Sequence, residues 1–312
     1  MKNVFKNKAV LIFLFCVVLS IICSLISDVF FTYDNLYNIS RNFSFIAIIA
    51  IGMTIVLLTG GIDVSVGSIM AVTGIITAII LNAGYSLVFG IAGGLCTALA
   101  CGLLNGILIT YIKLPAFIVT LASLSALRSL SLVILDGKLI YSFGPDEEVF
   151  LSIGGGTLLG LAIPVWILAI CALIFSFILN CTKLGKHFYA VGSNENSARL
   201  AGINVTKVKL SAYLISALMA GISAILMVSW LGSITSNLGL AYELDIIAAS
   251  VIGGASLFGG VGNISGSIAG AALLEVIRNF LLLVGIDSKW QGFFVGFLII
   301  VSLIIERIRK NK

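Results

Sequence analysis

Long apolar runs, separated by short polar intervals, follow one another along almost the whole chain. Several runs approach the length of helix that crosses a hydrocarbon layer about 30 Å thick, and alternating strands would not produce them. The pattern therefore predicts an all-α polytopic membrane protein with about ten transmembrane helices. The predicted spans are 9–26, 43–59, 66–81, 86–110, 117–135, 165–179, 210–231, 244–256, 268–284 and 293–305.

Two glycine-rich intervals, 60–68 and 253–267, break this helical pattern. Glycine lets the backbone leave the helix, and non-helical backbone at membrane depth is tolerated only where protein or a water-filled cavity surrounds it. Broken helices often supply polar groups to a transported solute, although tight turns between neighbouring spans fit the pattern equally well. The first break also carries Asp63, which could instead cap the third span.

Ionisable residues inside spans cost a few kcal/mol at the bilayer centre, so each suggests a pathway or a buried pair. Arg128 shares a helical arc with Thr120, Ser123 and Ser131, which predicts a polar stripe that faces other helices. Glu275 and Arg278 lie three residues apart and are expected to pair with each other. The candidate residues of a translocation pathway are Thr59, Gly60, Gly61, Asp63, Ser65, Ser68, Arg128, Gly253, Gly254, Gly259 and Gly260.

Composition supports the membrane assignment, because 60% of the residues are hydrophobic and only 10% are charged. The lysines and arginines between the predicted spans gather at the two termini, at Lys113 and in the interval 182–209, whereas Arg41, Lys138 and Lys289 lie on the other side. The positive-inside rule then places both termini and 182–209 in the cytoplasm, and 136–164 becomes the largest extracellular loop. The expected location is therefore the cytoplasmic membrane.

The chain shows no pattern of residues that performs covalent chemistry. Its one histidine, His187, has no acid or nucleophile nearby in sequence, and no metal-ligand spacing occurs. The P-loop pattern is absent, since Gly185 and Lys186 are followed by His187. We therefore expect a non-enzymatic subunit that binds no metal and no cofactor, and no nucleic acid.

Four blocks of sequence, in order, resemble a known family. GMTIVLLTGGIDVSVGS at 52–68 and KLPAFIVTLASLSALRSL at 113–130 are followed by YAVGSNENSARLAGINVTKVK at 189–209 and YELDIIAASVIGGASLFGGVGNISGS at 242–267. The motif WQGFFVG begins at Trp290. These blocks resemble the membrane permease subunits of bacterial ABC importers for ribose and related monosaccharides, although Val64, Ser193 and Ser197 replace the usual leucine, glycine and alanine.

The resemblance implies a type II-like ABC importer permease whose single transmembrane domain covers residues 1–312. It also implies a second permease copy or paralogue, ATPase subunits that bind ATP and magnesium, an extracellular solute-binding protein and a sugar substrate. In the wider importer family, an alanine followed four residues later by glycine marks the coupling helix that docks on the ATPase. Ala198 and Gly202 fit this spacing within the predicted coupling loop, 182–209.

The predicted docking helix extends over 194–205, and Gly202 is expected at its C-terminal end in the left-handed conformation that glycine accepts. The residues expected to couple to the ATPase are Gly192, Asn194, Ala198, Arg199, Gly202 and Asn204.

Other functions stay open on the sequence. Related permeases serve nucleosides, branched-chain amino acids, an acylated signal precursor or other small polar solutes. An ion-coupled secondary transporter could use Asp63 or Glu275 to carry protons or sodium. A membrane scaffold or sensor without transport is a further alternative.

Overall fold

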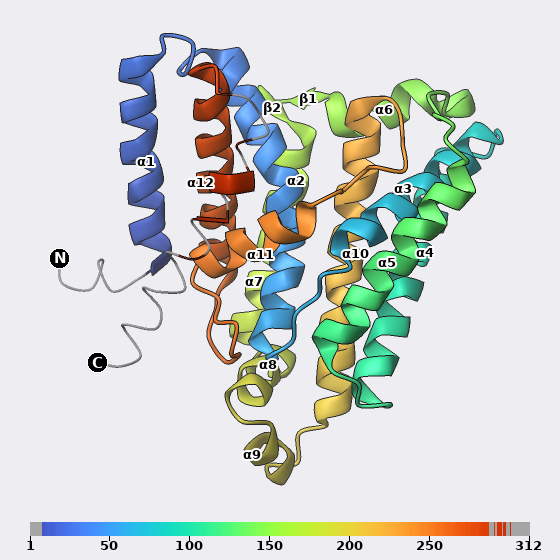
Figure 1. Ribbon diagram of the computed structural model, residues 1–312, viewed down its shortest axis with the longest axis vertical. Coiled ribbons are helices and arrows are strands. Elements are labelled where there is room, and N and C mark those ends of the chain that lie inside the picture. The colour runs from blue at the N-terminus through green and yellow to red at the C-terminus, as the bar shows by residue number, and fades with distance from the viewer. Residues whose placement is uncertain (1–7, 287–289, 291, 295, 298–299, 301–312) are drawn as a thin grey trace.

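Long helices run side by side through the computed structural model, which describes residues 8–286, 290, 292–294, 296–297 and 300 (Figure 1). Among these residues, six helices are long and apolar enough to span a membrane, and two further apolar segments, in α1 and α3, are shorter. The six are α2 (Tyr33–Leu58), α4 (Leu87–Thr110), α5 (Ala116–Leu135), α7 (Ile163–Cys181), α10 (Val205–Leu231) and α12 (Ile264–Leu283). The helices with the shorter apolar segments are α1 (Lys8–Ile26) and α3 (Val66–Asn82).

The predicted number of ten spans is not confirmed. The eighth predicted span corresponds to α11 (Tyr242–Ile252), which has 11 residues and rises only about 16 Å. This length cannot cross a layer about 30 Å thick, and Figure 1 shows α11 inclined across the middle of the molecule. Most of the tenth predicted span, 293–305, lies outside the described residues, as do the basic residues at both chain ends other than Lys8.

The second predicted span begins ten residues earlier than expected, at Tyr33 instead of Phe43. Thr32 caps this helix, because its hydroxyl accepts a hydrogen bond from the backbone N–H of Asn35. The polar residues of 33–42 therefore form the first helical turns of α2. Asn35 in these turns exchanges hydrogen bonds of 3.1 and 2.7 Å with Asn279 of α12.

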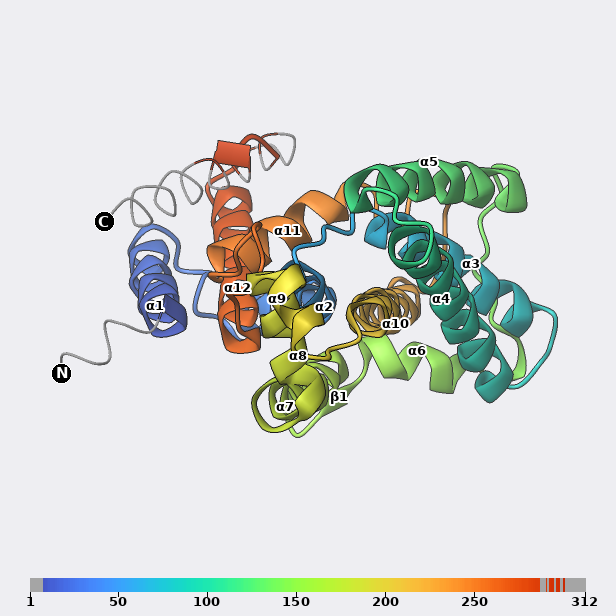
Figure 2. The same ribbon diagram turned by 90° about the horizontal axis from the view of Figure 1, so that it is seen from below.

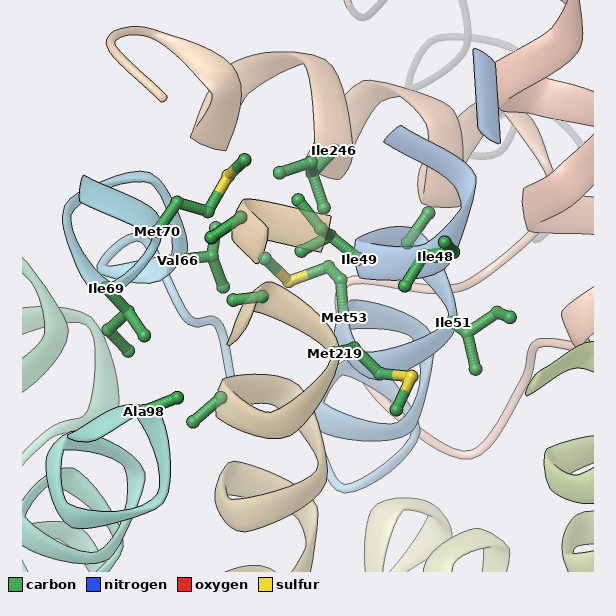
Figure 3. Packing of buried hydrophobic residues seen from close by; sticks show 14 of the residues in the cluster. Ile48, Ile49, Ile51, Met53, Val66, Ile69, Met70, Ala98, Met219 and Ile246 are labelled. Atoms are coloured by element: carbon green, nitrogen blue, oxygen red, sulfur yellow. The ribbon is translucent and has the colours of Figure 1, made fainter. Parts of the chain in front are cut away.

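The centre of the bundle is α2, whose residues from Ser44 to Leu58 are all buried. This helix is apolar on every side, so it is stable only where other helices surround it. Figure 3 shows Ile48, Ile49 and Met53 of α2 among side chains from α3, α10 and α11. Small residues allow close helix contacts in this core, because a side chain at Gly102 of α4 would meet α10 at Ala217.

Short elements cover the two ends of the bundle (Figure 1). One end, the α6 end, carries η2 (Gly144–Asp146), α6 (Glu147–Gly155) and a two-stranded antiparallel hairpin of β1 (Thr157–Leu158) and β2 (Leu161–Ala162), which an all-α prediction omits. The predicted extracellular loop 136–164 is therefore largely folded. The opposite end, the α9 end, carries α8 (Lys183–Ser193) and α9 (Glu195–Leu200), and Figure 2 views the molecule from that end.

Candidate functional site

The predicted coupling loop contains two helices, each of which begins at a capping side chain. The Thr182 hydroxyl accepts from the N–H of Gly185 at the start of α8, and the Asn194 carboxamide accepts from the N–H of Ser197 at the start of α9. Phe188 and Val191 bury one side of α8 against the bundle. Thus α8 is anchored to the membrane helices, whereas α9 forms the tip of this end.

The C-terminal end of α9 confirms the conformation predicted for Gly202, which has a φ of 81°. The N–H of Gly202 donates to Arg199 O and the N–H of Ile203 donates to Ala198 O, which together form a Schellman motif. The predicted helix over 194–205 is too long, because this motif ends α9 at Leu200 and Asn204 already caps α10. Asn204 accepts from the N–H of Lys207 at 3.0 Å.

Exposure divides the predicted coupling residues into two groups. Arg199 and Gly202 are exposed, whereas Ala198 is buried against its own chain. The structure adds Leu200, whose surface is 90% exposed at the tip of α9. Sequence reasoning missed Leu200, because Leu184, Phe188 and Ile203 are equally apolar in the same interval and only the structure shows which of these side chains is exposed.

An ion pair between Lys209 and Glu195 holds α9 against the start of α10, and a second pair, Arg199 with Glu195, lies within α9. Glu195 accepts from Lys209 at 2.6 Å and from Arg199 at 3.0 Å, and the hydrogen bond from Lys209 lowers the pKa of Glu195 below its ordinary value. A cavity of about 410 Å³ opens beside these pairs and is lined on its other sides by Lys113 and by the break at Gly60. Basic residues that the sequence assigned to one side of the membrane therefore meet at the α9 end.

The first glycine-rich break is organised by the carboxylate of Asp63, which is 1% exposed. Asp63 accepts from the Ser65 N–H at 3.1 Å, from the Ser65 hydroxyl at 2.5 Å and from the Ser216 hydroxyl of α10 at 2.9 Å. These bonds satisfy a buried polar group and fix the turn into α3. The Tyr213 hydroxyl, close to Gly61, is buried without a hydrogen-bond partner.

Polar side chains of α4 and α5 extend this network. Asn105 donates to the Ser65 hydroxyl at 2.9 Å and accepts a short hydrogen bond from Ser123, while Thr120 donates to Ile62 O at 3.2 Å. The predicted polar stripe on α5 thus faces other helices at Thr120 and Ser123. The network connects the first break to three neighbouring helices, α4, α5 and α10.

Arg128, the charged member of the stripe, lies toward the α6 end of the bundle. Its guanidinium donates to Ser236 O at 2.8 Å and to Leu238 O at 2.9 Å, both in the segment between α10 and α11. The same segment lines a cavity of about 270 Å³ together with Tyr242. Arg128 therefore fixes the wall of this cavity and does not join the residues at the two breaks.

Replacing Arg128 with Met is expected to loosen residues 232–241. The substitution removes two charge-assisted hydrogen bonds, each worth about 1.5–3 kcal/mol, while keeping most of the apolar stem. Amide hydrogen exchange of this segment should accelerate at least about tenfold, since about 1.4 kcal/mol corresponds to a factor of ten. Exchange within α2 serves as the internal control, and an unchanged rate at 232–241 would contradict the anchoring role.

The two breaks meet, although almost two hundred residues separate them in sequence. The N–H of Gly260 donates to Leu58 O at 3.0 Å, and a side chain at Gly259 would lie 3.1 Å from the Cα of Gly60. At the start of the second break, Gly253 lies close to Gly266 of α12. The remaining predicted pathway residues are placed around these contacts: Thr59 at the end of α2, Gly61 beside Tyr213, Ser68 on α3 and Gly254 after α11.

A buried ion pair joins α11 to α12, and it differs from the predicted one. Arg278 contacts the carboxylate of Asp245 on α11 and not that of Glu275 on its own helix. Both partners are largely buried, with 17% and 12% of their side-chain surfaces exposed. Packing of α11 against α12 therefore supplies the negative charge that pairs with Arg278. The spacing of residues within α12 could not indicate a partner on another helix.

Among the residues that the structure describes, no three His, Cys, Asp or Glu side chains lie together as metal ligands. What the site offers is a set of hydrogen-bonding groups at two helix breaks, next to an exposed helical tip. Hydrogen-bonding groups at helix breaks of this kind are found in solute pathways.

Comparison with known proteins assigns the chain to a family. Residues 35–303 match the family described as branched-chain amino acid transport system / permease component. Ribose import permease protein RbsC of Haemophilus influenzae is 37% identical over 301 residues, which cover 96% of this chain and 93% of that protein. The protein of the same name from Escherichia coli K12 is 39% identical over 290 residues, with 93% and 90% coverage.

L-arabinose transport system permease protein AraH of Escherichia coli K12 is 35% identical over 294 residues, which cover 94% of this chain and 89% of that protein. Full-length similarity of this kind, together with the apolar helices, describes a multi-pass membrane protein. The chain belongs to the family of transport-system permease components that this match defines.

Proposed function

We propose that this chain is the permease subunit of an ATP-driven importer that carries a monosaccharide, ribose or a related sugar, across the cytoplasmic membrane. The observation that carries the proposal is its similarity along nearly the full length to permeases named for ribose and L-arabinose. The chain itself performs no covalent step. Closure of ATPase subunits would bias a two-state membrane element, and the solute would cross as its pathway changes side.

The α9 end is the proposed docking site for the ATPase. It presents an anchored helix, α8, followed by the exposed tip of α9 with Arg199, Leu200 and Gly202. Its basic character supports a cytoplasmic position, and the N-terminal end of α1 points away from the α6 end in Figure 1, which supports a cytoplasmic N-terminus. A solute-binding protein would then approach the α6 end, and a second permease copy or paralogue would complete the pathway.

Uptake by the reconstituted complex tests the proposal. The chain is purified with its ATPase and binding protein, reconstituted into proteoliposomes, and supplied with radiolabelled ribose outside and ATP at the ATPase side. We expect uptake that requires ATP, the binding protein and this chain together. Proteoliposomes that lack only this chain are the control.

The same assay separates the alternatives. Competition by unlabelled L-arabinose, a nucleoside or leucine ranks the cargo, and the family description makes leucine a necessary arm. Uptake that continues without the ATPase and follows an ion gradient would instead identify a secondary transporter. Absence of flux for every solute in the intact complex would favour a scaffold or sensor.

A further inference from the structure

Three backbone segments from distant parts of the chain meet at one place, which we call the glycine junction. It consists of residues 58–60 at the end of α2, residues 192–193 at the end of α8 and residues 259–262 between α11 and α12. Two of these segments belong to the helix breaks, and the third belongs to the coupling loop. Their contact therefore links the docking end of the chain to both breaks.

The contacts at the glycine junction are made by backbone atoms. Gly260 donates its N–H to Leu58 O at 3.0 Å. A Cβ atom at Gly259 would lie 2.7 Å from Gly192 O and 3.1 Å from the Cα of Gly60. The three backbone segments therefore touch without intervening side chains. Tyr189 of α8 adds a hydrogen bond of 2.8 Å from its hydroxyl to Gly262 O.

Gly192 is the residue that permits this approach. A Cβ atom there would overlap the Leu58 carbonyl and lie 2.6 Å from the Gly260 nitrogen. Both neighbours are backbone atoms, which cannot turn away as a flexible side chain can. Any larger residue must therefore push α8 away from the two breaks.

Direct backbone contact transmits displacement with little loss. Side chains at an interface can change rotamer and absorb a small movement, whereas close-packed backbone segments have low compressibility. A shift of α8 at the glycine junction would move the end of α2 and the 259–262 segment by a similar amount. The hydrogen bond from Tyr189 to Gly262 O opposes movement of α8 away from the 259–262 segment.

We propose that Gly192 and Tyr189 are positioning residues that fix α8 to both helix breaks, so that these three segments move as one body during the transport cycle. This inference rests on the proposed function, because it assumes that an ATPase displaces the α9 end. It moves Gly192 from the docking surface, where the sequence placed it, to the mechanical connection behind that surface.

Gly192→Ala tests the connection by its effect on coupling. In the reconstituted complex, sugar uptake per ATP hydrolysed is expected to fall at least about tenfold while ATP hydrolysis continues, since a tenfold change needs only about 1.4 kcal/mol. Gly296→Ala is the matched control, because a Cβ atom at Gly296 meets nothing within 4 Å and the residue belongs to no proposed docking surface or pathway. An unchanged uptake-to-hydrolysis ratio in Gly192→Ala would overturn the proposal.

Tyr189→Phe keeps the test informative if Gly192→Ala does not fold. It removes one hydroxyl and the bond to Gly262 and preserves the ring. We expect the uptake-to-hydrolysis ratio to fall about threefold to tenfold, in keeping with one hydrogen bond worth about 0.5–1.5 kcal/mol. A purely structural role would lower the amount of folded complex and leave this ratio unchanged.

Cross-linking tests the one-body movement independently of the solute. Ser193 and Gly260 are replaced by cysteine in a chain whose six native cysteines are changed to alanine, because the Ser193 Cα lies 3.1 Å from a Cβ built at Gly260. Cysteine at Gly260 must adopt a φ of 72° and displaces its neighbours, so the same variant is compared with itself in two states. Disulfide yield is measured in the full complex without nucleotide and with vanadate-trapped ATP. Equal high yields are expected, and a yield that falls in the trapped state would show that the glycine junction opens.

The two kinds of failure are distinguishable. Wild-type complex that takes up no sugar would refute the proposed cargo, while the disulfide yields still report on the glycine junction. Wild-type complex that transports sugar, combined with state-dependent yields or an unchanged ratio in both variants, would refute the junction alone.

Discussion

Gly202→Asp is expected to abolish ATP-driven uptake while the permease still folds in the membrane. Gly202 has a φ of 81°, and a Cβ atom there meets nothing within 4 Å, so the aspartate costs only the strain of the left-handed conformation, about 1 kcal/mol. In the proposed complex the same position faces the ATPase groove. A carboxylate buried there without a partner costs several kcal/mol, which weakens docking by about a hundredfold or more.

Two control variants separate charge and strain from docking. Gly202→Asn has nearly the same shape and accepts the same backbone conformation without the charge, so it should retain more uptake than Gly202→Asp. Gly84→Asp places the same carboxylate in a matching motif, since Gly84 has a φ of 86°, follows α3 and also has open space around its Cβ position. Gly84 lies at the α6 end, where Asn82 bonds Ser142 O.

Three measurements decide the outcome: the amount of folded permease in membranes, copurification of the ATPase, and ATP-dependent sugar uptake. Loss of ATPase copurification with normal permease levels is the expected result for Gly202→Asp. Normal uptake by this variant would count against the docking role of α9. Equal loss of ATPase copurification in Gly84→Asp would show that any carboxylate in such a motif is harmful.

Arg278→Leu is expected to destabilise the folded permease by about 3–5 kcal/mol, the usual cost of removing one partner of a buried ion pair. The Asp245 carboxylate would stay largely buried on α11 without its cation, close enough to Glu275 for repulsion to add to the cost. Thermal unfolding of the purified chain in detergent should shift downward by roughly 10 °C.

A second substitution tests whether the unpaired Asp245 charge causes the loss of stability in Arg278→Leu. Asp245→Asn combined with Arg278→Leu removes both charges and should recover a large part of the lost stability, since the penalty comes from the unpaired charge. Arg199→Leu is the matched control, because Arg199 forms an exposed pair with Glu195 and such pairs contribute about 0–1 kcal/mol. A small shift for Arg278→Leu, similar to that of Arg199→Leu, would mean that water reaches the pair in solution.

Several local predictions succeeded because short-range signals controlled them. Gly202 ends α9 in the left-handed conformation, and Thr120 and Ser123 of the predicted stripe bond other helices or the first break. The boundaries of α2 and α10 were missed because Thr32 and Asn204 act as N-caps of longer helices. Pairing of Arg278 with Asp245 was missed because the partner belongs to a helix that sequence spacing cannot bring near.

By itself, the sequence determined that this is a multi-pass helical membrane protein, where its helices break and that Gly202 ends the coupling helix. Apolar periodicity, glycine conformational freedom and capping are properties of residues close together along the chain. Only the tertiary structure decided that α2 is the buried centre, that Arg128 anchors the 232–241 segment, and that Leu58, Gly192 and Gly260 meet. These contacts join residues far apart in sequence, so they depend on how the helices pack and not on any local pattern.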